Sequence, residues 1–448
     1  MHSQSRVRQH NRKGAQMLAD NITAGTDGRL RFAGHDVTAL AKEYGTPLFL
    51  LDEDRIRDNC REYKSALATC FGNQARPLYA GKALAFRRIY EIMKEEDMGI
   101  DVVSSGELYT ALQSGYDVSN AYFHGNNKTD ADIRYGIKNG TGCFVVDNVE
   151  EICSIEREAA EKNMRQKILI RLTPGIDPHT FAAVATGKVD SKFGNAIETG
   201  QAEEIAALAL TKPHVDLYGF HCHIGSQIFD TDIYLRTVHI MLTFIALMKN
   251  RYGFETRELD LGGGFGVRYT EEDPEISVTG TVVAIADTVK ETCARLEINI
   301  PALRLEPGRS IVADAGMTLY TVGSVKTIPG YKNYVSVDGG MTDNPRFALY
   351  GSRYTCLAAN KTTEEASFPC DLAGRCCESG DIIQANVLLP QSISRGDLIA
   401  VCTTGAYNYA MASNYNRIPR PPVIMLSGGN HYIAVRRERF EDLVINDV

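Results

Sequence analysis

The chain has 448 residues, which is more than one hydrophobic core usually supports, so we expect two domains. Hydrophobic residues make up 44% of the chain and charged residues 23%, as in a soluble globular protein, and the net charge of -8 argues against a nucleic-acid partner. The 11 cysteines have no regular spacing, which fits reduced thiols in the cytoplasm better than a disulfide scaffold.

The sequence shows no membrane span and no signal peptide. The longest strongly apolar stretch covers residues 240–248, far fewer than the roughly 20 residues that cross a bilayer. Residues 1–14 are basic and contain no acidic residue, and no apolar core follows them. We expect a disordered tail there, with a short organelle-targeting remnant as the alternative, and a cytoplasmic protein without a membrane partner.

Residues 77–306 alternate between strand-like and helix-like segments. The strand-like segments are short and rich in β-branched or aromatic residues, and most precede a helical pattern. They cover residues 77–82, 99–103, 121–124, 143–146, 167–172, 215–221, 257–261 and 302–306. After Thr231, apolar residues recur at three- and four-residue spacing, and residues 104–107 have the S-x-x-E form of a helix capping box. Eight strand–helix units predict a (β/α)₈ barrel of the TIM type.

The character of the sequence changes after residue 310. Short alternating strands punctuated by glycine and proline predict an all-β domain. The expected strands are 319–327, 334–337, 381–387, 397–402 and 423–426, and residues 29–33 form another that could pair with them. We therefore expect the barrel to span residues 45–309, and residues 1–44 with 310–448 to form a β-sandwich or β-barrel domain.

Polar residues follow the expected barrel strands at their carboxyl ends. They are Lys82, Ser104, His124, Asp147, Arg171, His221 and His223, Gly262 to Gly264, and Glu306 with Arg309. Individually they have ordinary explanations, since His124 could be a buried histidine and Asp147 a helix N-cap. Barrel enzymes hold their chemistry at this end of the strands, so the whole set predicts an active site. A lysine there can bond covalently to a carbonyl cofactor.

Two motifs within this set allow more than one interpretation. The glycine-rich residues 262–266 let backbone N–H groups approach an anion, but an ordinary turn after a strand is equally compatible. His221 and His223 lie on one face of a strand, because side chains alternate. They could be metal ligands, as in zinc hydrolases, or one imidazole could pack on a cofactor ring. The glycine and serine at Gly225 and Ser226 favour the second interpretation.

Several short motifs together give the chain a specific resemblance. They are YAGK (79–82), HCHIGSQ (221–227), GGGFG (262–266), EPGR (306–309), CESGD (377–381), GAY (405–407) and MASNYN (411–416). In this order they resemble the diaminopimelate decarboxylases, a family of fold-type III pyridoxal-phosphate enzymes, from about residue 30 to 440. Two departures are visible, because Leu84 stands where the family usually has asparagine, and Phe181 follows Thr180 where it usually has histidine.

The resemblance implies a role for most of the polar residues. Lys82 would hold pyridoxal phosphate covalently, and His223 would stack on its ring. The remaining cofactor-binding residues would be Ser226, Gly263, Gly264, Glu306, Gly308, Arg309 and Tyr407. A carboxylate such as Glu306 beside the pyridine nitrogen favours the protonated ring, a strong electron sink, and therefore favours decarboxylation over racemisation. Cys377 of a partner subunit in a homodimer would return a proton to Cα, unless it is a small buried hydrophobe like Cys376.

The implied reaction is decarboxylation of meso-2,6-diaminopimelate to L-lysine and CO₂, the last step of lysine biosynthesis. Glu378 would pair with the distal amine, while Arg346 and Tyr350, with Arg309 and Tyr407 nearby, would bind the distal carboxylate. The alternative for Arg346 is a surface ion pair.

Other functions are possible on the same residues. The chain could decarboxylate another basic amino acid, namely D-lysine, D-ornithine, ornithine or arginine. It could also be a zinc hydrolase using His221 and His223, or a catalytically inactive homologue. The expected cofactor is pyridoxal phosphate, and we expect no metal.

Overall fold

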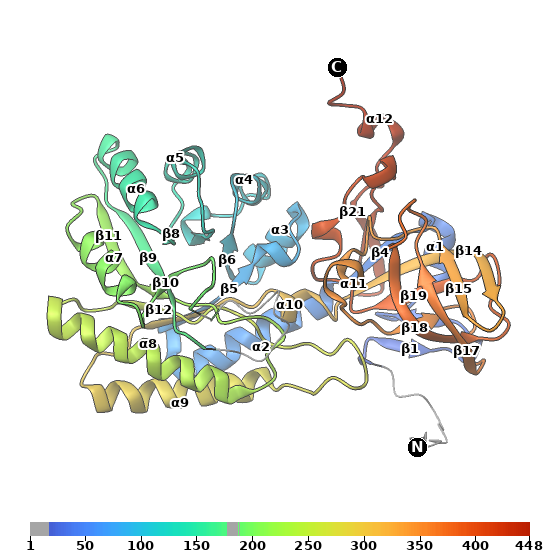
Figure 1. Cartoon of the computed structure of the whole chain (residues 1–448), viewed down its shortest axis with the longest axis horizontal. Helices are drawn as coiled ribbons and strands as arrows, with labels where there is room; N and C mark the ends of the chain where they lie inside the picture. The colour runs from blue at the N-terminus through green and yellow to red at the C-terminus, as the bar shows by residue number, and fades with distance from the viewer. Residues whose placement is uncertain (1–17, 177–186, 188) are drawn as a thin grey trace.

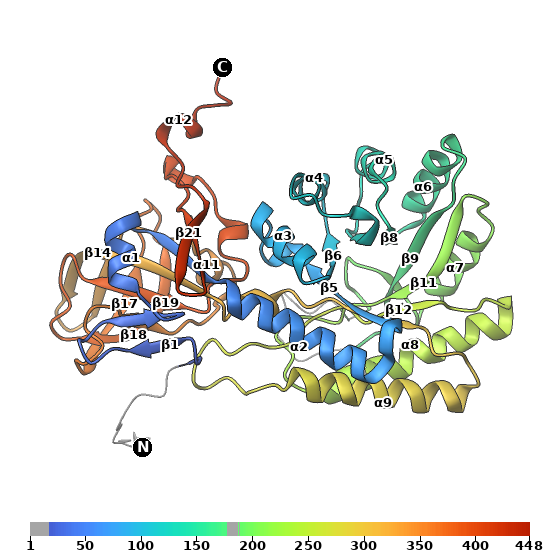
Figure 2. The same cartoon turned by 180° about the vertical axis from the view of Figure 1, so that it is seen from behind.

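The computed structural model describes residues 18–176, 187 and 189–448. These residues fold into a β/α barrel and a second part built mainly of strands, and the two lie side by side (Figures 1 and 2). The expected tail over residues 1–14 and the Thr180-Phe181 pair lie outside the described residues.

Eight parallel strands form the barrel. They are β5 (Ala75–Ala80), β6 (Gly99–Val102), β7 (Ala121–Phe123), β8 (Cys143–Val146), β9 (Gln166–Thr173), β11 (Val215–His221), β12 (Glu258–Asp260) and β13 (Ala302–Leu305). They pair in the order β9-β11-β12-β13-β5-β6-β7-β8, and the β8–β9 pairing closes the ring. A two-residue strand, β10 (Asn195–Ala196), pairs with the end of β9. The predicted barrel is confirmed, with each strand at its expected place.

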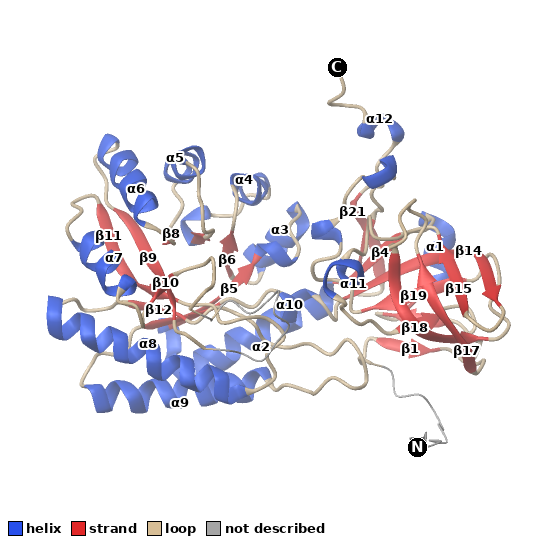
Figure 3. Ribbon diagram, viewed as in Figure 1, coloured by secondary structure: helices blue, strands red, loops and turns tan. Residues whose placement is uncertain are grey.

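Helices surround the barrel (Figure 3). They are α2 (Glu53–Phe71), α3 (Arg87–Glu95), α4 (Ser105–Gln113), α5 (Asp130–Asn139), α6 (Val149–Glu161), α7 (Gln201–Leu210), α8 (Thr231–Tyr252), α9 (Val278–Leu296) and the short α10 (Arg309–Val312). Ser104 begins α4 as the capping-box pattern predicts, because its Oγ accepts the N–H of Glu107 at 3.2 Å. Asp147 is not a helix cap, since Asn148 caps α6 and Asp147 instead accepts the N–H of Gly194.

Helix α8 is the one described helix that is long and apolar enough to cross a membrane by length and composition. It contains the apolar stretch 240–248. In the fold, 56% of its apolar window is buried, and α8 lies beside α9 on the outside of the barrel (Figure 1). Val238, Met241 and Leu242 belong to the main core cluster. Packing against the barrel therefore accounts for the hydropathy of this helix.

Alternation of side chains along the strands fills the barrel in layers. At the amino-terminal end, the buried carboxylate of Glu258 contacts Lys167 at 3.1 Å and Arg304 at 2.8 Å. Above it, Leu78 and Leu169 belong to a separate buried apolar cluster. These layers fill the amino-terminal part of the barrel, and the polar residues lie at the opposite, carboxyl ends of the strands.

The second part is a mixed sheet with a small three-stranded sheet beside it. Its strands are β4 (Leu48–Asp52), β14 (Gly316–Ile328), β15 (Lys332–Val337), β16 (Cys356–Ala358), β17 (Ala366–Ala373), β18 (Ile382–Pro390), β19 (Leu398–Cys402), β20 (Val423–Ser427) and β21 (Asn430–Val435); the small sheet has β1 (Ile22–Ala24), β2 (Leu30–Phe32) and β3 (His35–Asp36). The short helices α1 (Val37–Tyr44), α11 (Arg346–Tyr350) and α12 (Phe440–Leu443) complete it. The predicted β domain is confirmed, although the sequence did not indicate β1, β3, β4, β16, β17 or β21.

Strand β4 belongs to the second part rather than to the barrel. It pairs antiparallel with β14 and parallel with β20, and its Leu48 and Leu50 lie in the core of that sheet. The boundary expected at residue 45 precedes this strand. We propose that the barrel begins with α2, at residue 53, and that the chain crosses to it directly from β4.

Candidate active site

A small cavity of about 30 Å³ lies at the carboxyl ends of the barrel strands. Its lining residues are Ala80, Lys82, His223, Ser226, Gly264, Phe265, Glu306, Gly308, Arg309, Ser310 and Tyr407. Every residue that the sequence assigned to cofactor binding is in this lining except Gly263, whose N–H donates to His223 Nδ1 at 3.2 Å. Residues from β5, β11, β13 and a loop of the second part thus meet at one place.

Lys82 reaches this cavity from a single turn of 3₁₀ helix, Gly81–Ala83, that directly follows β5. Burial lowers the pKa of its ammonium group, but Asp101, Tyr407 and Glu306 outweigh burial and raise that pKa above the usual value. The sequence did not single out Asp101. Its two carboxylate oxygens are buried without a hydrogen-bond partner among the described residues, and His124 Nε2 lies 3.8 Å from Oδ1.

Backbone and guanidinium groups make one wall of the cavity suited to an anion. Arg309 donates from Nε and Nη2 to Ser226 Oγ at 3.2 and 3.0 Å. Gly264 has a φ of +102°, and a Cβ there would lie 2.5 Å from the carbonyl oxygen of Gly225. A side chain at Gly308 would crowd the Cβ of Ala80 at 2.8 Å. Glycine is therefore required at both positions, which leaves the wall open to a phosphate-sized group.

Tyr407 connects the second part of the chain to the cavity. Its N–H donates to the carbonyl oxygen of Ala83 at 2.8 Å, and its φ of 62° is unusual for a bulky residue. The guanidinium carbons of Arg309 and Arg346 lie 4.8 and 5.1 Å from the centre of its ring. Arg346 also lies 5.1 Å from the ring of Tyr350. Three of the predicted substrate-binding residues, Arg346, Tyr350 and Arg309, therefore gather around Tyr407.

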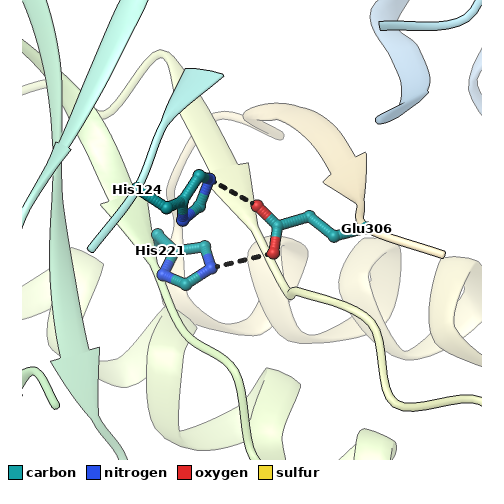
Figure 4. Close-up of side chains that lie close together, drawn as sticks. All are labelled: His124, His221 and Glu306. Carbon is teal, nitrogen blue, oxygen red and sulfur yellow. Dashed lines mark hydrogen bonds and ion pairs between the residues drawn. The ribbon is translucent and has the colours of Figure 1, made fainter. Parts of the chain in front are cut away.

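Two histidines hold the carboxylate of Glu306 (Figure 4). His221 Nε2 lies 3.2 Å from Oε2, and His124 Nε2 lies 2.8 Å from Oε1. Burial raises the pKa of Glu306, but the contacts with His124 and then His221 outweigh it, so the pKa lies well below the usual range. Burial also lowers the pKa of His221 to about 3. Glu306 is therefore ionised at neutral pH, and His221 is neutral.

The same three residues have to be considered as a metal site, because one ligand atom from each lies within 4.8 Å of the others. The zinc interpretation of the sequence required His221 with His223, but His221 faces Glu306 while His223 faces the cavity. A metal-bound histidine normally donates its second ring N–H to an acceptor. Nδ1 of His221 is buried without a hydrogen-bond partner among the described residues. This arrangement favours a hydrogen-bonded carboxylate over a metal centre.

Comparison with known proteins agrees with this geometry. Residues 53–313 match the family model of the pyridoxal-dependent decarboxylases, pyridoxal binding domain. A diaminopimelate decarboxylase of Bacillus subtilis is 44% identical over 421 residues, which cover 94% of this chain and 95% of that protein. The chain belongs to the diaminopimelate decarboxylase family of pyridoxal-dependent enzymes.

Solved structures show the same fold. A crystal structure of diaminopimelate decarboxylase from M. jannaschii in complex with L-lysine superposes with a TM-score of 0.87 at 32% identity, covering 96% of this chain and 98% of that chain. A lysine/ornithine decarboxylase from Vibrio vulnificus, in complex with putrescine, is more distant, with a TM-score of 0.73 and 26% identity over 87% of this chain and 97% of that one.

The residues that line the cavity suit the cofactor of this family in their chemistry. Lys82 supplies an amine, the wall formed by Arg309, Ser226 and the glycines supplies donors for a phosphate, and Glu306 supplies an anion at the closed end. The Leu84 departure does not alter this lining. Leu84 is buried in the main core, and its backbone closes the lysine turn by donating to the carbonyl oxygen of Gly81 at 3.0 Å.

Arg346 and Tyr350 lie beside Tyr407 rather than in the cavity lining, whereas Cys377 and Glu378 belong to neither group within one chain. Cys377 is exposed, and its N–H donates to Asn416 Oδ1 at 2.7 Å. Glu378 is also exposed, and its Oε1 accepts the N–H of Gly380 at 3.3 Å. The alternative in which Cys377 is a small buried hydrophobe is wrong, whereas the description fits Cys376, which is buried and whose pKa burial raises to about 11.

Other residues of the site escaped the sequence analysis. Tyr269 accepts a hydrogen bond at 2.7 Å from Arg309 Nη1, and Asp260 lies buried beneath Glu306 with its Oδ1 bound to the N–H of Gly262 at 2.8 Å. Burial and then Glu306 raise the pKa of Asp260 well above its usual value. Asp101 lies two residues before the expected strand end at 103 and Asp260 one residue before the expected end at 261, so no single count from the strand ends would have identified both.

Proposed function

We propose that this chain decarboxylates meso-2,6-diaminopimelate to L-lysine with pyridoxal phosphate held at Lys82. The observation that carries the proposal is the meeting of Lys82, Glu306, Arg309 and Arg346 around Tyr407 and one cavity, in a chain that is 44% identical to a diaminopimelate decarboxylase. An amine, an anion for the ring nitrogen, a phosphate wall and a second arginine for a distal carboxylate are the parts that this reaction needs.

Each part acts through its own chemistry. Pyridoxal phosphate, when bound, supplies an electron sink that takes up the electron pair left by departing CO₂. Glu306 is ionised and so favours a proton on the ring nitrogen, which deepens that sink. His223 accepts a hydrogen bond at Nδ1, which leaves its ring neutral to pack against the cofactor. Arg309 and Ser226 bind the phosphate end and fix its orientation.

The distal carboxylate of the substrate is the group that distinguishes diaminopimelate from lysine, ornithine and arginine. Arg346 is 6% exposed, and its Nε atom is buried without a hydrogen-bond partner among the described residues. A buried arginine with an unpaired Nε, lying between two tyrosine rings, is suited to a bidentate contact with a carboxylate. The position beside Tyr407 places that contact next to the cavity.

Two copies of the chain would complete each site. Cys377 and Glu378 lie on the exposed loop between β17 and β18 and are absent from the lining of the cavity. They therefore have the place expected of residues that serve the cavity of a partner copy. There Cys377 Sγ would deliver the proton to Cα, and Glu378 would bind the distal amine. The cytoplasmic location and the absence of nucleic-acid and membrane partners stay predictions of the sequence.

Product analysis tests the proposed reaction. The purified protein with pyridoxal phosphate is incubated with meso-diaminopimelate, D-lysine, D-ornithine, ornithine or arginine, and products are identified by mass spectrometry. A site built around a polar group rejects analogues that lack it by about 10⁴-fold. We expect lysine and CO₂ from diaminopimelate, at a kcat/KM that exceeds the others by roughly this factor. Preference for any of the other four substrates would replace the proposed function.

Replacement of Arg346 by alanine should raise KM for diaminopimelate at least about 30-fold, since removing one partner of a buried charge pair costs about 2–5 kcal/mol. The slow reaction with D-lysine, which lacks the distal carboxylate, should change far less. The control is Arg346→Lys, which keeps the charge but loses the bidentate geometry. Its KM for diaminopimelate should lie between those of the native protein and Arg346→Ala. An equal rise in KM for diaminopimelate and for D-lysine would mean that Arg346 serves packing instead.

A further inference from the structure

His221 is one of two histidines of the strand-end set, with His124, to which the proposed reaction gives no role. It is fully buried at the end of β11, and its ring packs edge-on against that of His124 with centroids 4.9 Å apart. Figure 4 shows both rings directed at the two oxygens of Glu306. The contact from His221 is the aligned hydrogen bond of the two, because the His124 contact at 2.8 Å does not meet hydrogen-bond geometry.

The surroundings of His221 determine where its proton lies. Nε2 faces the ionised carboxylate of Glu306 at 3.2 Å, which can only accept a hydrogen bond. Nδ1 is buried and has no hydrogen-bond partner among the described residues. Protonation of both nitrogens would leave a buried N–H without an acceptor, so the favoured form is the neutral ring with its hydrogen on Nε2.

We propose that His221 is a positioning residue that holds Glu306 Oε2 with a neutral hydrogen bond and thereby directs the charge of this carboxylate to the ring nitrogen of the cofactor. The inference rests on the proposed function, because it assigns the acceptor of that charge to pyridoxal phosphate. A neutral donor is needed for this purpose. A lysine or arginine at position 221 would pair with the carboxylate and compete with the protonated ring for it.

The barrel keeps this hydrogen bond in place from several sides. β11 pairs with β12, which pairs with β13, and the N–H of Glu306 donates to the carbonyl oxygen of Gly262 at 2.8 Å. Asp260 is buried beside Glu306, and burial together with the nearby carboxylate raises its pKa, which disfavours a second negative charge there. Arg171 faces the same group, although burial lowers its own pKa. These contacts fix the main chain at Glu306, and His221 then holds the orientation of the carboxylate itself through Oε2.

Nitrogen NMR of the bound cofactor tests this role directly. The native protein and its variants are loaded with pyridoxal phosphate labelled with ¹⁵N in the ring, whose chemical shift reports protonation of that nitrogen. His221→Phe keeps a ring but removes the donor, whereas His221→Gln keeps an N–H near the position of Nε2. Cys222→Ala, at the residue that directly follows β11 and is equally buried, is the control for lost packing. Glu306→Gln provides the reference chemical shift for a deprotonated ring nitrogen.

We expect the native, Cys222→Ala and His221→Gln proteins to carry a protonated ring nitrogen, and His221→Phe to shift toward Glu306→Gln. The Kd for pyridoxal phosphate should rise about tenfold or more in His221→Phe, the usual effect of losing one hydrogen bond to a charged group. An unchanged shift and Kd in His221→Phe, or a native-like fold of His221→Gln with a deprotonated ring, would overturn the proposal.

A second measurement needs no variant. Selective ¹⁵N labelling of histidine in the native protein should show one ring with its hydrogen on Nε2 across the whole pH range in which the protein is folded. If His221 is instead doubly protonated at neutral pH, the proposal is wrong even where His221→Phe fails to fold. Failure of the native protein to bind the cofactor at Lys82 would contradict the proposed function itself and is a separate result.

Discussion

Replacement of Lys82 by alanine is expected to lower turnover by at least about 10³-fold, because the proposed function makes this amine the covalent anchor of the cofactor, and even a single acid–base group is typically worth about 10²–10⁴. Lys82 is the lysine of the cavity lining. Borohydride reduction followed by peptide mass spectrometry should find the reduced cofactor on the Lys82 peptide of the native protein. The variant should show no such peptide and no visible absorption from lysine-bound cofactor.

The control for this experiment is Lys138→Ala, which removes an exposed lysine from the last turn of α5 and should leave turnover and labelling unchanged. Lys82→Ala should keep the native circular dichroism spectrum, because the turn around Lys82 is closed by backbone hydrogen bonds from Leu84 and Tyr407 that do not need its side chain. A reduced cofactor on another lysine of the folded variant would show that Lys82 is not the anchor.

The barrel and most of its site could be predicted from the sequence because short local sequence patterns indicate both. Short apolar runs followed by helical periodicity mark the strands, and a polar residue immediately after such a run lies at the carboxyl end. Lys82, His223 and Glu306 were found by this rule together with the family motifs. Their convergence on one cavity follows from the closed strand order, which brings β5, β11 and β13 to the same rim.

What the sequence did not indicate depends on contacts between distant segments. β4 was not among the expected strands, and its pairing with β14 and β20 assigns it to the second sheet. The contacts of His221 and His124 with Glu306 also connect distant parts of the chain. His221 precedes Glu306 by 85 residues, and His124 precedes it by 182 residues. The unusual backbone of Tyr407 likewise depends on a hydrogen bond to Ala83.

Homodimers of Lys82→Ala and of Cys377→Ala are each expected to be nearly inactive, yet a mixture of the two should recover activity when subunits exchange. Lys82 lies in the barrel cavity, whereas Cys377 lies exposed on the second part of the chain and away from that cavity's lining. In a two-fold dimer the two patches meet twice, so each dimer has two composite sites. A heterodimer contains one site with both intact residues and one site with neither.

Random exchange of equal amounts makes about half of the dimers heterodimers, and one of their two sites is intact, so recovery should approach about a quarter of native turnover. Native mass spectrometry measures the exchange, and a mixture of Lys82→Ala with Lys82→Met is the control that exchanges without any intact site. If Lys82 and Cys377 acted within one chain, every site in the heterodimer would lack one of them. Confirmed exchange without recovery would therefore place Cys377 outside the partner's site and leave the proton at Cα to another group.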